Sequence, residues 1–484
     1  MLPEKRYLVW FGHNNSYFSH RFREFESVSQ MLGLDVNALF IGSRPSSLST
    51  DPYAIVRLPS DDIAIEICKH AVLTRLILEI WGSGSTDHEV IESVKHSISD
   101  EHWSSHLLGK TFGYKVIGYG IQHTDKTRRD RMTAFGSLFK GYERVDMRTA
   151  GTLLYIIDEH DHNFDQTGTR NELIQAAKKR TFYGRLVAEN DNSQRSRFAL
   201  NKRAVLGPTS LDNDLAFIMA NMAEIKMGSF VCDPFCGTGG LLITASAKSG
   251  GFLPPVGTDI DVRVLRGEYV AYIKNRLTED MQSDIFQNFK SYNLPMPEIF
   301  VSDNNNPCWR MAGCKFDVIL TDPPYGVRAG AKKIGAKFTH EIENRDDYYP
   351  QMLGYQAEEV NLDLLRLASA LLVDNGLLVF LLHVELMDLF STEELRHLPR
   401  NEAENASKSN RATKIKTSKS SGKEYVYANE CAREKQFLDE ASIIERVVPK
   451  HPDLVTESAV LQILAAGTGR VLVKMRKRIP TMPS

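Results

Sequence analysis

The residues best suited to specific chemistry follow an apolar run of the chain, where Asp322, Pro323 and Tyr325 belong to the sequence Asp-Pro-Pro-Tyr. These residue types suit a reaction on a planar amino group, which is a poor nucleophile because its lone pair is delocalised. Asp322 offers a carboxylate and Pro323 a backbone carbonyl, and two such acceptors would hold both N–H bonds in a preorganised arrangement that favours a tetrahedral nitrogen. Tyr325 offers a ring on which a base can stack, a contact worth about 1–3 kcal/mol. The alternative interpretation is a strand that ends in a Pro-Pro turn.

A glycine-rich turn lies upstream, in the sequence Asp-Pro-Phe-Cys-Gly-Thr-Gly-Gly that begins at Asp233. The apolar residues 230–232 before it predict a buried strand, and the run 241–247 after it predicts a helix. Strand, glycine turn and helix form the arrangement by which open α/β sheets bind a nucleotide cofactor outside the strand ends. The turn is not followed by Gly-Lys-Ser/Thr, so we do not expect a P-loop.

Two further acidic residues end predicted strands. Asp259 lies 20 positions after Gly239, which is the spacing expected of a carboxylate that holds a ribose. Asp303 ends the predicted strand 299–303 and could contact an adenine amino group. Each residue also has a simpler interpretation as a turn residue. For Asp303 this alternative is stronger, because the turn-forming sequence Asn-Asn-Asn-Pro follows it.

The elements that must position these residues alternate between strand and helix, which predicts an α/β fold. The chain of 484 residues is long enough for roughly two to four domains. We expect four segments, namely a small N-terminal α/β unit at 1–58, a less regular segment at 60–165, a linker at 166–205 and a Rossmann-like α/β domain at 206–476.

Local patterns within these segments predict individual elements. Phe22, Phe25 and Val28 recur at helical spacing, and residues 36–40 read as a strand. We also expect helical structure through most of 61–81 and at 171–180. Residues 399–436 contain a Ser-, Lys- and Asn-rich stretch that cannot bury a core, which predicts a disordered insertion inside the catalytic domain.

Local excesses of positive charge contrast with the net charge of −2. Residues 109–148 hold nine Lys or Arg against four acidic residues, and residues 168–203 hold nine against three. Phosphate binding is one interpretation and a solvated helix face is the other. Because both runs lie upstream of a domain that acts on a base amine, we favour RNA or DNA contact. The candidate RNA-binding residues are Arg128, Arg129, Arg131 and Arg185.

The sequence also indicates where the protein is located in the cell and whether it contains a metal site. No apolar run is long enough to cross a bilayer, and no charged-then-apolar leader opens the chain, so we expect a cytoplasmic protein. Its six cysteines form no paired Cys-x-x-Cys pattern, so no metal site is predicted in this chain.

The order of glycine turn, ribose acid, adenine acid and Asp-Pro-Pro-Tyr resembles that of class I methyltransferases that act on exocyclic amines with S-adenosyl-L-methionine. Longer segments resemble one family in this class, the eukaryotic tRNA (guanine-10-N2)-methyltransferases. The matching segments are 206–212, 215–223, 233–242 and 321–331, together with Tyr183-Gly184-Arg185 and the opening residues 7–11.

This resemblance implies a fold, an activity and a partner. It implies that residues 60–165 form a THUMP domain that binds the acceptor end of tRNA, and that the catalytic domain methylates guanosine N2 at position ten. It further implies a heterodimer with a small zinc-binding activator subunit.

The resemblance also implies residue roles. Asp233, Gly237 and Gly239 would cradle the methionine part of the cofactor, with Phe235 in the same motif. Asp259 would hold the ribose and Asp303 the adenine. The implied catalytic residues are Asp322, Pro323 and Tyr325, which would orient a guanine amine flipped out of its stack.

Two alternative functions remain open at this point. Asp-Pro-Pro-Tyr also serves adenine-N6 nucleic-acid methyltransferases. A non-enzymatic RNA-binding protein with a degenerate methyltransferase core is the second alternative, although the intact acidic residues and glycines argue against it.

Overall fold

The structure is a computed structural model that describes residues 5–11, 17–46, 49, 51–119, 121, 123–160, 178–207, 210–267, 284–310, 313, 315–324, 332–334, 352–390, 438–464 and 467–479. The contacts divide these residues into two units, one made of residues up to 21 and 34–191, the other of 22–33, 192–396 and 438–484. Tyr325, the insertion predicted at 399–436 and most of the helix predicted at 171–180 lie outside the described residues.

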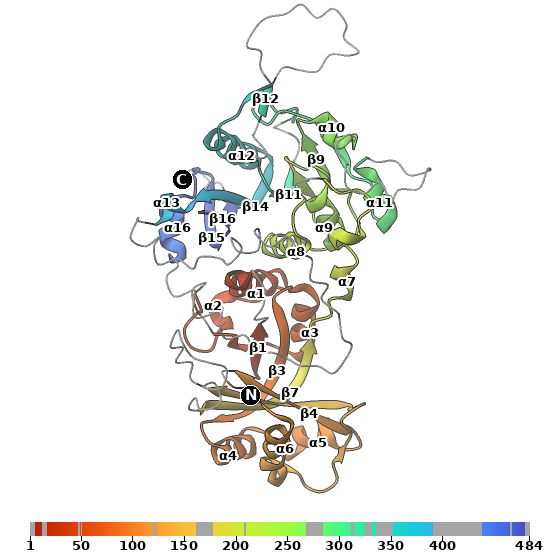
Figure 1. Ribbon diagram of the computed structural model, residues 1–484, viewed down its shortest axis with the longest axis vertical. Coiled ribbons are helices and arrows are strands. Elements are labelled where there is room, and N and C mark those ends of the chain that lie inside the picture. The colour runs from red at the N-terminus through yellow and green to blue at the C-terminus, as the bar shows by residue number, and fades with distance from the viewer. Residues whose placement is uncertain are drawn as a thin grey trace, which may run out of the picture. The chain divides into compact units, whose positions relative to one another are not determined.

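A seven-stranded sheet forms the first unit, in the order β2-β1-β3-β7-β6-β4-β5 (Figure 1). Its strands are β1 (Arg6–Phe11), β2 (Tyr53–Arg57), β3 (Thr74–Gly84), β4 (Thr111–Tyr119), β5 (Arg144–Val145), β6 (Thr152–His160) and β7 (Lys178–Glu189). Its α-helices are α2 (Val36–Leu39), α3 (Asp61–His70), α4 (Asp87–Ser97), α5 (Asp100–Leu107) and α6 (Asp125–Ala134). Strand β4 pairs in parallel with β5 and β6, and the other pairs are antiparallel.

Both faces of this sheet are buried by apolar side chains. On β6, Ile156 joins one core cluster and its neighbour Ile157 joins another. On β7, Tyr183 and Phe182 divide between the same two clusters. Successive side chains of a strand point to opposite faces, so this division places one cluster on each side of the sheet.

The first unit corrects three local predictions. Residues predicted as a strand at 36–40 form helix α2, because the Asp35 side chain caps it by accepting a hydrogen bond from the Asn37 amide. The helix predicted through 61–81 ends at His70, and strand β3 follows. Residues 178–180, predicted as helix, begin strand β7.

The sheet of the first unit is built from three of the predicted segments. Strands from 1–58 and from 60–165 pair within it, so no break in the sheet marks a boundary near residue 59. Strand β7 lies in the predicted linker at 166–205 and occupies the middle of the sheet between β3 and β6. Long-range pairing of this kind leaves no local signature, which is why the sequence did not predict it.

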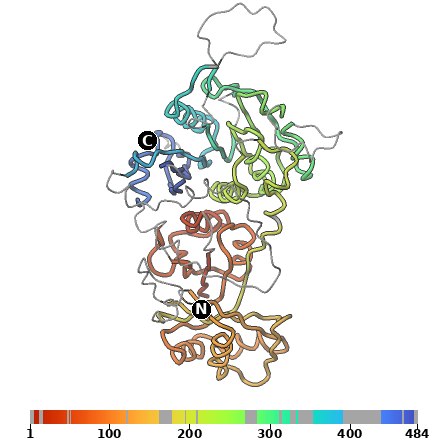
Figure 2. Tube along the Cα trace, viewed as in Figure 1, coloured from red at the N-terminus to blue at the C-terminus, as the bar shows by residue number. Residues whose placement is uncertain are grey.

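The second unit contains a seven-stranded sheet in the order β10-β9-β8-β11-β14-β16-β15. Its strands are β8 (Val231–Asp233), β9 (Val256–Asp259), β10 (Glu298–Val301), β11 (Phe316–Thr321), β14 (Leu372–Glu385), β15 (Leu454–Ile463) and β16 (Thr468–Lys477). The first five strands in that order run parallel, and β16 is antiparallel to both β14 and β15. Figure 2 shows the blue C-terminal strands beside the cyan β14. Strands β15 and β16 form an antiparallel pair at one end of the sheet.

The remaining elements of this unit connect or cover the sheet. A separate two-stranded sheet joins β12 (Lys332–Ile334) to β13 (Met352–Gly354). The helices are α7 (Ser193–Ser196), α8 (Asn213–Met222), α9 (Gly240–Lys248), α10 (Val262–Leu265), α11 (Phe286–Tyr292), α12 (Ala357–Leu371), α13 (Leu386–Leu389) and α16 (Glu440–Arg446). No helix among the described residues is long and apolar enough to cross a membrane.

Helix α1 (Arg21–Met31) is present as predicted, but from Phe22 onward it belongs to the second unit. Its polar residues explain this placement. Asn221 of α8 donates a hydrogen bond to Glu24 at 2.6 Å, and Lys474 of β16 donates one to Ser27 at 3.2 Å. Arg23 donates to Glu440 of α16 at 2.9 Å. Helix α1 therefore contributes to the core of the catalytic unit, whereas the sequence analysis placed it in the N-terminal unit.

Candidate active site

The predicted acidic residues of the second unit come together at one edge of its sheet. Asp233 ends β8 and Asp259 ends β9, while Asp322 directly follows β11. These three strands are parallel, so their carboxyl ends meet at the same edge. Open α/β sheets bind their ligands at this edge, outside the strand ends. The parallel sheet therefore unites residues that lie far apart in the chain.

Asp233 forms the buried centre of this edge. Its side chain is 2% exposed, and its Oδ1 accepts hydrogen bonds from the Thr321 hydroxyl at 2.6 Å and from the Phe235 amide at 3.1 Å. The bond from Thr321 joins β8 to β11 directly before Asp322. Burial raises the pKa of Asp233 to about 7, and the negative charge of Asp259 adds to this effect. A cationic ligand group at this edge would favour the ionised carboxylate, since opposite charges stabilise each other.

The glycine turn is held in shape by Asp259. The Gly237 amide donates a hydrogen bond to Asp259 Oδ2 at 2.9 Å, and the Asp261 amide donates one to Oδ1 at the same distance. Gly237 has a φ of 51° and Gly239, which precedes α9, has a φ of 77°. Residues with a Cβ rarely adopt these angles, so glycine is required at both positions. A Cβ built at Gly237 would meet nothing within 4 Å, which leaves open space for a ligand beside the turn.

Asp259 retains the capacity to bind a ligand. Burial raises its pKa, while the hydrogen bonds from backbone amides lower it. A carboxylate offers about four lone-pair sites, and the backbone amides of Gly237, Ile260 and Asp261 do not occupy all of them. The geometry thus fits the predicted contact with a ribose diol.

The two remaining candidate cofactor residues have partners in the protein. Asp303 is 5% exposed and accepts hydrogen bonds from the amides of Asn305 at 3.0 Å and Ile334 at 2.8 Å. The first of these bonds is the turn interaction considered as its alternative interpretation. Phe235 is half-buried and packs against a small cluster of Tyr355 and Val360.

The predicted catalytic segment lies beside a histidine of β14 that its sequence does not reveal. Pro323 is buried, and the Asp322 side chain is 23% exposed. His383 of β14 places its Nε2 atom 3.4 Å from Asp322 Oδ1. Burial lowers the pKa of His383, and the carboxylate of Asp322 opposes this shift. The sequence offered one signal, a single histidine within the apolar run of β14. This signal could not be used, because sequence spacing does not show which strand lies beside Asp-Pro-Pro-Tyr.

The four candidate RNA-binding arginines, all in the first unit, differ in their surroundings. Arg131 donates to both carboxylate oxygens of Asp158 at 2.8 Å, and Asp158 is 1% exposed. Arg185 donates to Glu79 at 3.0 and 2.9 Å, and Glu79 is 3% exposed. A buried carboxylate requires a paired charge, so we assign Arg131 and Arg185 to the stability of the sheet rather than to RNA.

Arg128 and Arg129 remain candidates for RNA contact. Both lie on α6, a helix without buried residues, and Arg129 is exposed. Arg128 has an ion pair with exposed Asp125 at 3.5 Å, a distance that indicates a weak interaction. Because Arg131 ties the same helix to Asp158 of β6, it holds α6 in place while its neighbours face solvent.

Comparisons with known proteins identify relatives of both units. Residues 5–192 match the family described as the Tmrp11 THUMP N-terminal domain, and residues 201–346 match the RMKL-like methyltransferase domain. The tRNA (guanine(10)-N(2))-methyltransferase TRMT11 of Dictyostelium discoideum is 30% identical over 397 residues, which cover 78% of this chain and 73% of the relative. The protein of the same name from Xenopus laevis is 31% identical over 390 residues, which cover 78% of this chain and 76% of the relative.

Among solved structures, TrmN from Thermus thermophilus aligns with 98% of this chain and 99% of its own, with 14% sequence identity and a TM-score of 0.40. At this score the alignment carries no argument about the site.

Proposed function

Because this chain belongs to the family of tRNA (guanine(10)-N2)-methyltransferases, we propose that it transfers a methyl group from S-adenosyl-L-methionine to the N2 amine of guanosine ten in tRNA. The observation that supports this most directly is the hydrogen bond from Thr321 to Asp233, because it joins the cofactor edge of β8 to the segment containing Asp322. The acceptors for the amine and the residues for the cofactor therefore lie on adjacent parallel strands.

The residues at this edge fit the cofactor. S-adenosyl-L-methionine supplies an electrophilic methyl group on a positively charged sulfonium. The open space at Gly237 accommodates a ligand against the backbone, and Asp233 stabilises positive charge in the ligand. Asp259 accepts hydrogen bonds from a ribose, and Asp303 retains lone pairs for an adenine amino group.

The amine is activated by two acceptors of fixed position. Asp322 accepts one N–H bond of guanine N2 and the Pro323 carbonyl accepts the other, so that the nitrogen lone pair points at the methyl group. When bound, S-adenosyl-L-methionine would supply the methyl group and leave as the neutral thioether, and Asp322 would accept the proton that the nitrogen loses. Because the acceptors need no reorganisation during the reaction, they lower its barrier.

A test of this function is mass spectrometry of tRNA. The purified protein, with S-adenosyl-L-methionine and unmodified tRNA, should yield N2-methylguanosine at position ten. Methylation of adenine in the same tRNA, or of duplex DNA alone, would contradict the assignment.

His383 predicts a pH dependence of the reaction. Neutral His383 donates to Asp322 and orients its carboxylate, whereas protonated His383 forms an ion pair that weakens Asp322 as an acceptor for the amine. Burial lowers the pKa of His383 below its ordinary value of about 6.5, so kcat should be level near neutral pH and fall as the pH drops below that value. We expect this acidic limb to disappear in His383→Gln, which keeps a donor and cannot titrate.

The measurement is kcat against pH for the wild-type protein and His383→Gln at saturating cofactor. If kcat fell at the same acidic pH in both proteins, the fall would arise from a titratable group other than His383.

We infer that α6 contacts tRNA phosphates through Arg128 and Arg129. Arg128→Gln combined with Arg129→Gln should weaken binding of all tRNAs alike and reduce the slope of log affinity against log salt by about 1.4–1.8 for two lost phosphate contacts. A matched control removes two exposed lysines of the same unit, Lys69→Gln and Lys95→Gln, on helices α3 and α4. Binding measured over a salt series decides the question, and equal slopes for both double variants would return Arg128 and Arg129 to a solvated helix face.

We infer that the small zinc-binding activator subunit pairs with the exposed edge of β10. Among the described residues, this strand lies at one end of the sheet, where it pairs with β9, and β15 lies at the other end. Phe300 and Val301 of β10 are 45% and 55% exposed, and neighbouring Met296 is 42% exposed. An apolar edge strand aggregates unless it is covered, and an added strand gains main-chain hydrogen bonds. The chain alone should therefore be poorly soluble, and co-expression with the subunit should make it soluble.

A charge on this edge should abolish the pairing. Val301→Glu should reduce recovery of the co-expressed subunit about tenfold or more in a pull-down, because a charge would be buried without a partner. Val455→Glu on β15, where Val455 is 41% exposed, is the matched control and should leave recovery unchanged. Loss of the subunit with Val455→Glu and not with Val301→Glu would move the interface to β15.

A further inference from the structure

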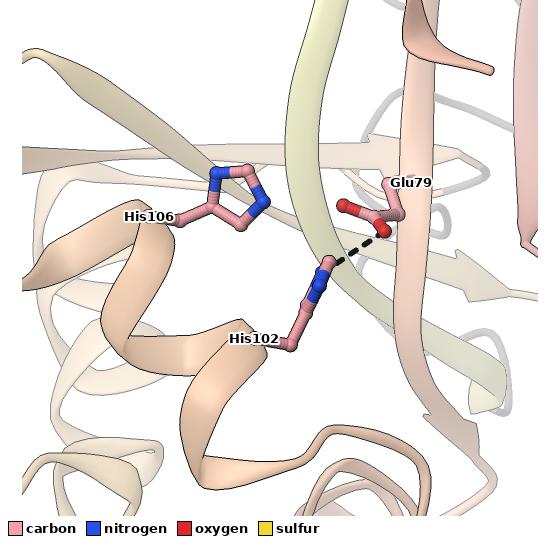
Figure 3. A group of neighbouring side chains, drawn as sticks. All are labelled: Glu79, His102 and His106. Carbon is pink, nitrogen blue, oxygen red and sulfur yellow. Dashed lines mark ion pairs between the residues drawn. The ribbon is translucent and has the colours of Figure 1, made fainter. Parts of the chain in front are cut away.

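Three potential metal ligands converge in the first unit (Figure 3). Glu79 comes from β3, and His102 and His106 come from α5. One ligand atom from each residue lies within 4.8 Å of the others. The histidines are four positions apart, which places both on one face of the helix, and the same spacing occurs in helices that bind zinc.

Glu79 has one oxygen engaged and one directed at the histidines. Its Oε2 accepts hydrogen bonds from Trp81 at 3.1 Å and from Arg185 at 3.0 and 2.9 Å. Its Oε1 lies 3.0 Å from His102 Nε2 and 3.6 Å from Lys5 Nζ. A metal ion bound to Oε1 would leave the contacts at Oε2 intact, and such contacts orient a ligating carboxylate.

His102 Nε2 is buried and lies 3.0 Å from Glu79 Oε1, so two of the three potential ligand atoms already face each other. A metal ion bound to both atoms would take the place of this contact. Lys5 lies closer to Asp61, at 3.2 Å, so it can leave Oε1 without losing its ion pair.

We propose that Glu79, His102 and His106 bind a divalent transition-metal ion, with zinc as the expected ion. Two imidazoles and one carboxylate are a ligand set that zinc takes with tetrahedral geometry, and water would fill the fourth position. Arg185 and Lys5 place positive charge nearby, so the site binds zinc more weakly than a cysteine-rich structural site. The bound ion would fasten α5 to β3 in the domain that matches the THUMP family. The sequence analysis examined only cysteine patterns and therefore predicted no metal site.

Cobalt absorption tests this proposal without any enzyme assay. The tag-free protein, purified with its partner and stripped by a chelator, is titrated with Co²⁺, which absorbs strongly in the visible range when it is tetrahedral. The wild-type complex should bind one Co²⁺ ion more than the His106→Ala complex, seen as additional visible absorption that Zn²⁺ then abolishes. His106→Ala should lose this additional absorption, and His96→Ala, a change at an exposed histidine of α4, should keep it. Each variant is measured in complex with the same partner, so metal bound by the partner contributes equally to every spectrum and is removed by subtraction.

Thermal unfolding provides a second readout. Zn²⁺ should raise the unfolding midpoint of the wild-type protein and of His96→Ala, and should leave His106→Ala unchanged, because only a site present in the folded state stabilises it. Far-ultraviolet circular dichroism checks that His106→Ala is folded. The absence of this additional absorption in the wild-type complex, or equal absorption in the complex of folded His106→Ala, would overturn the proposal.

Discussion

Asp322→Ala should lower kcat for tRNA methylation by about a factor of 10²–10⁴ while leaving cofactor affinity nearly unchanged. Asp322 follows β11 at the carboxyl edge of the sheet and is the only acidic side chain of the Asp-Pro-Pro-Tyr sequence. Its removal takes away one of the two acceptors that align the guanine amine. The proposed cofactor contacts come from the ends of β8 and β9 and from the glycine turn after β8, so cofactor affinity should be retained.

Two measurements separate these effects. Single-turnover transfer of a labelled methyl group reports the chemical step, and calorimetry with S-adenosylhomocysteine reports cofactor binding. Asp374→Ala is a matched control, because Asp374 is an exposed carboxylate near the amino end of β14, at the opposite edge of the sheet. Turnover of Asp322→Ala close to the wild-type rate would remove Asp322 from the mechanism.

Asp259→Ala should weaken cofactor binding by about tenfold to a hundredfold. Two losses combine in this variant. The carboxylate no longer holds the ribose, and the Gly237 amide loses its acceptor at 2.9 Å, which loosens the glycine turn. Affinity for tRNA should stay the same, because the arginines assigned to phosphate contact lie in the other unit.

The control for this variant is Asp261→Ala. Asp261 is a nearby carboxylate whose side chain pairs with Arg263 at 2.7 Å instead of holding the turn. Calorimetry with S-adenosylhomocysteine and tRNA binding by filter retention give the two affinities. A wild-type cofactor dissociation constant for Asp259→Ala would show that this residue serves only the turn.

The sequence was sufficient where chemistry depends on residues close together in the chain. The glycine turn could be located because its backbone requires glycine at Gly237 and Gly239, where φ is positive. The strand before it and the helix after it follow from apolar runs, and the structure confirms both. The acidic residues could be assigned to strand ends for the same reason.

Local sequence patterns gave the wrong element where the same apolar residues can form either a helix or a strand. Residues 36–40 have the apolar character of a strand, but Asp35 caps a short helix. The apolar run after His70 continues the pattern of α3, yet it forms strand β3 because β1 and β7 pair with it. Strand pairing is a property of distant segments, so no local window of the sequence contains it.

The sequence by itself determined the class of chemistry, since Asp-Pro-Pro-Tyr and the cofactor turn each lie within a few consecutive residues. Only the tertiary structure decided which side chains are used in contacts within the protein and which can bind a ligand. Arg131 and Arg128 are three positions apart and read alike, but Arg131 pairs with buried Asp158, whereas Arg128 pairs with exposed Asp125. His383 likewise became part of the site only when β14 paired with β11. The physical reason is that a buried charge is stable only beside an oppositely charged partner, and that partner comes from a distant part of the chain. Only the folded structure shows which residues are paired in this way.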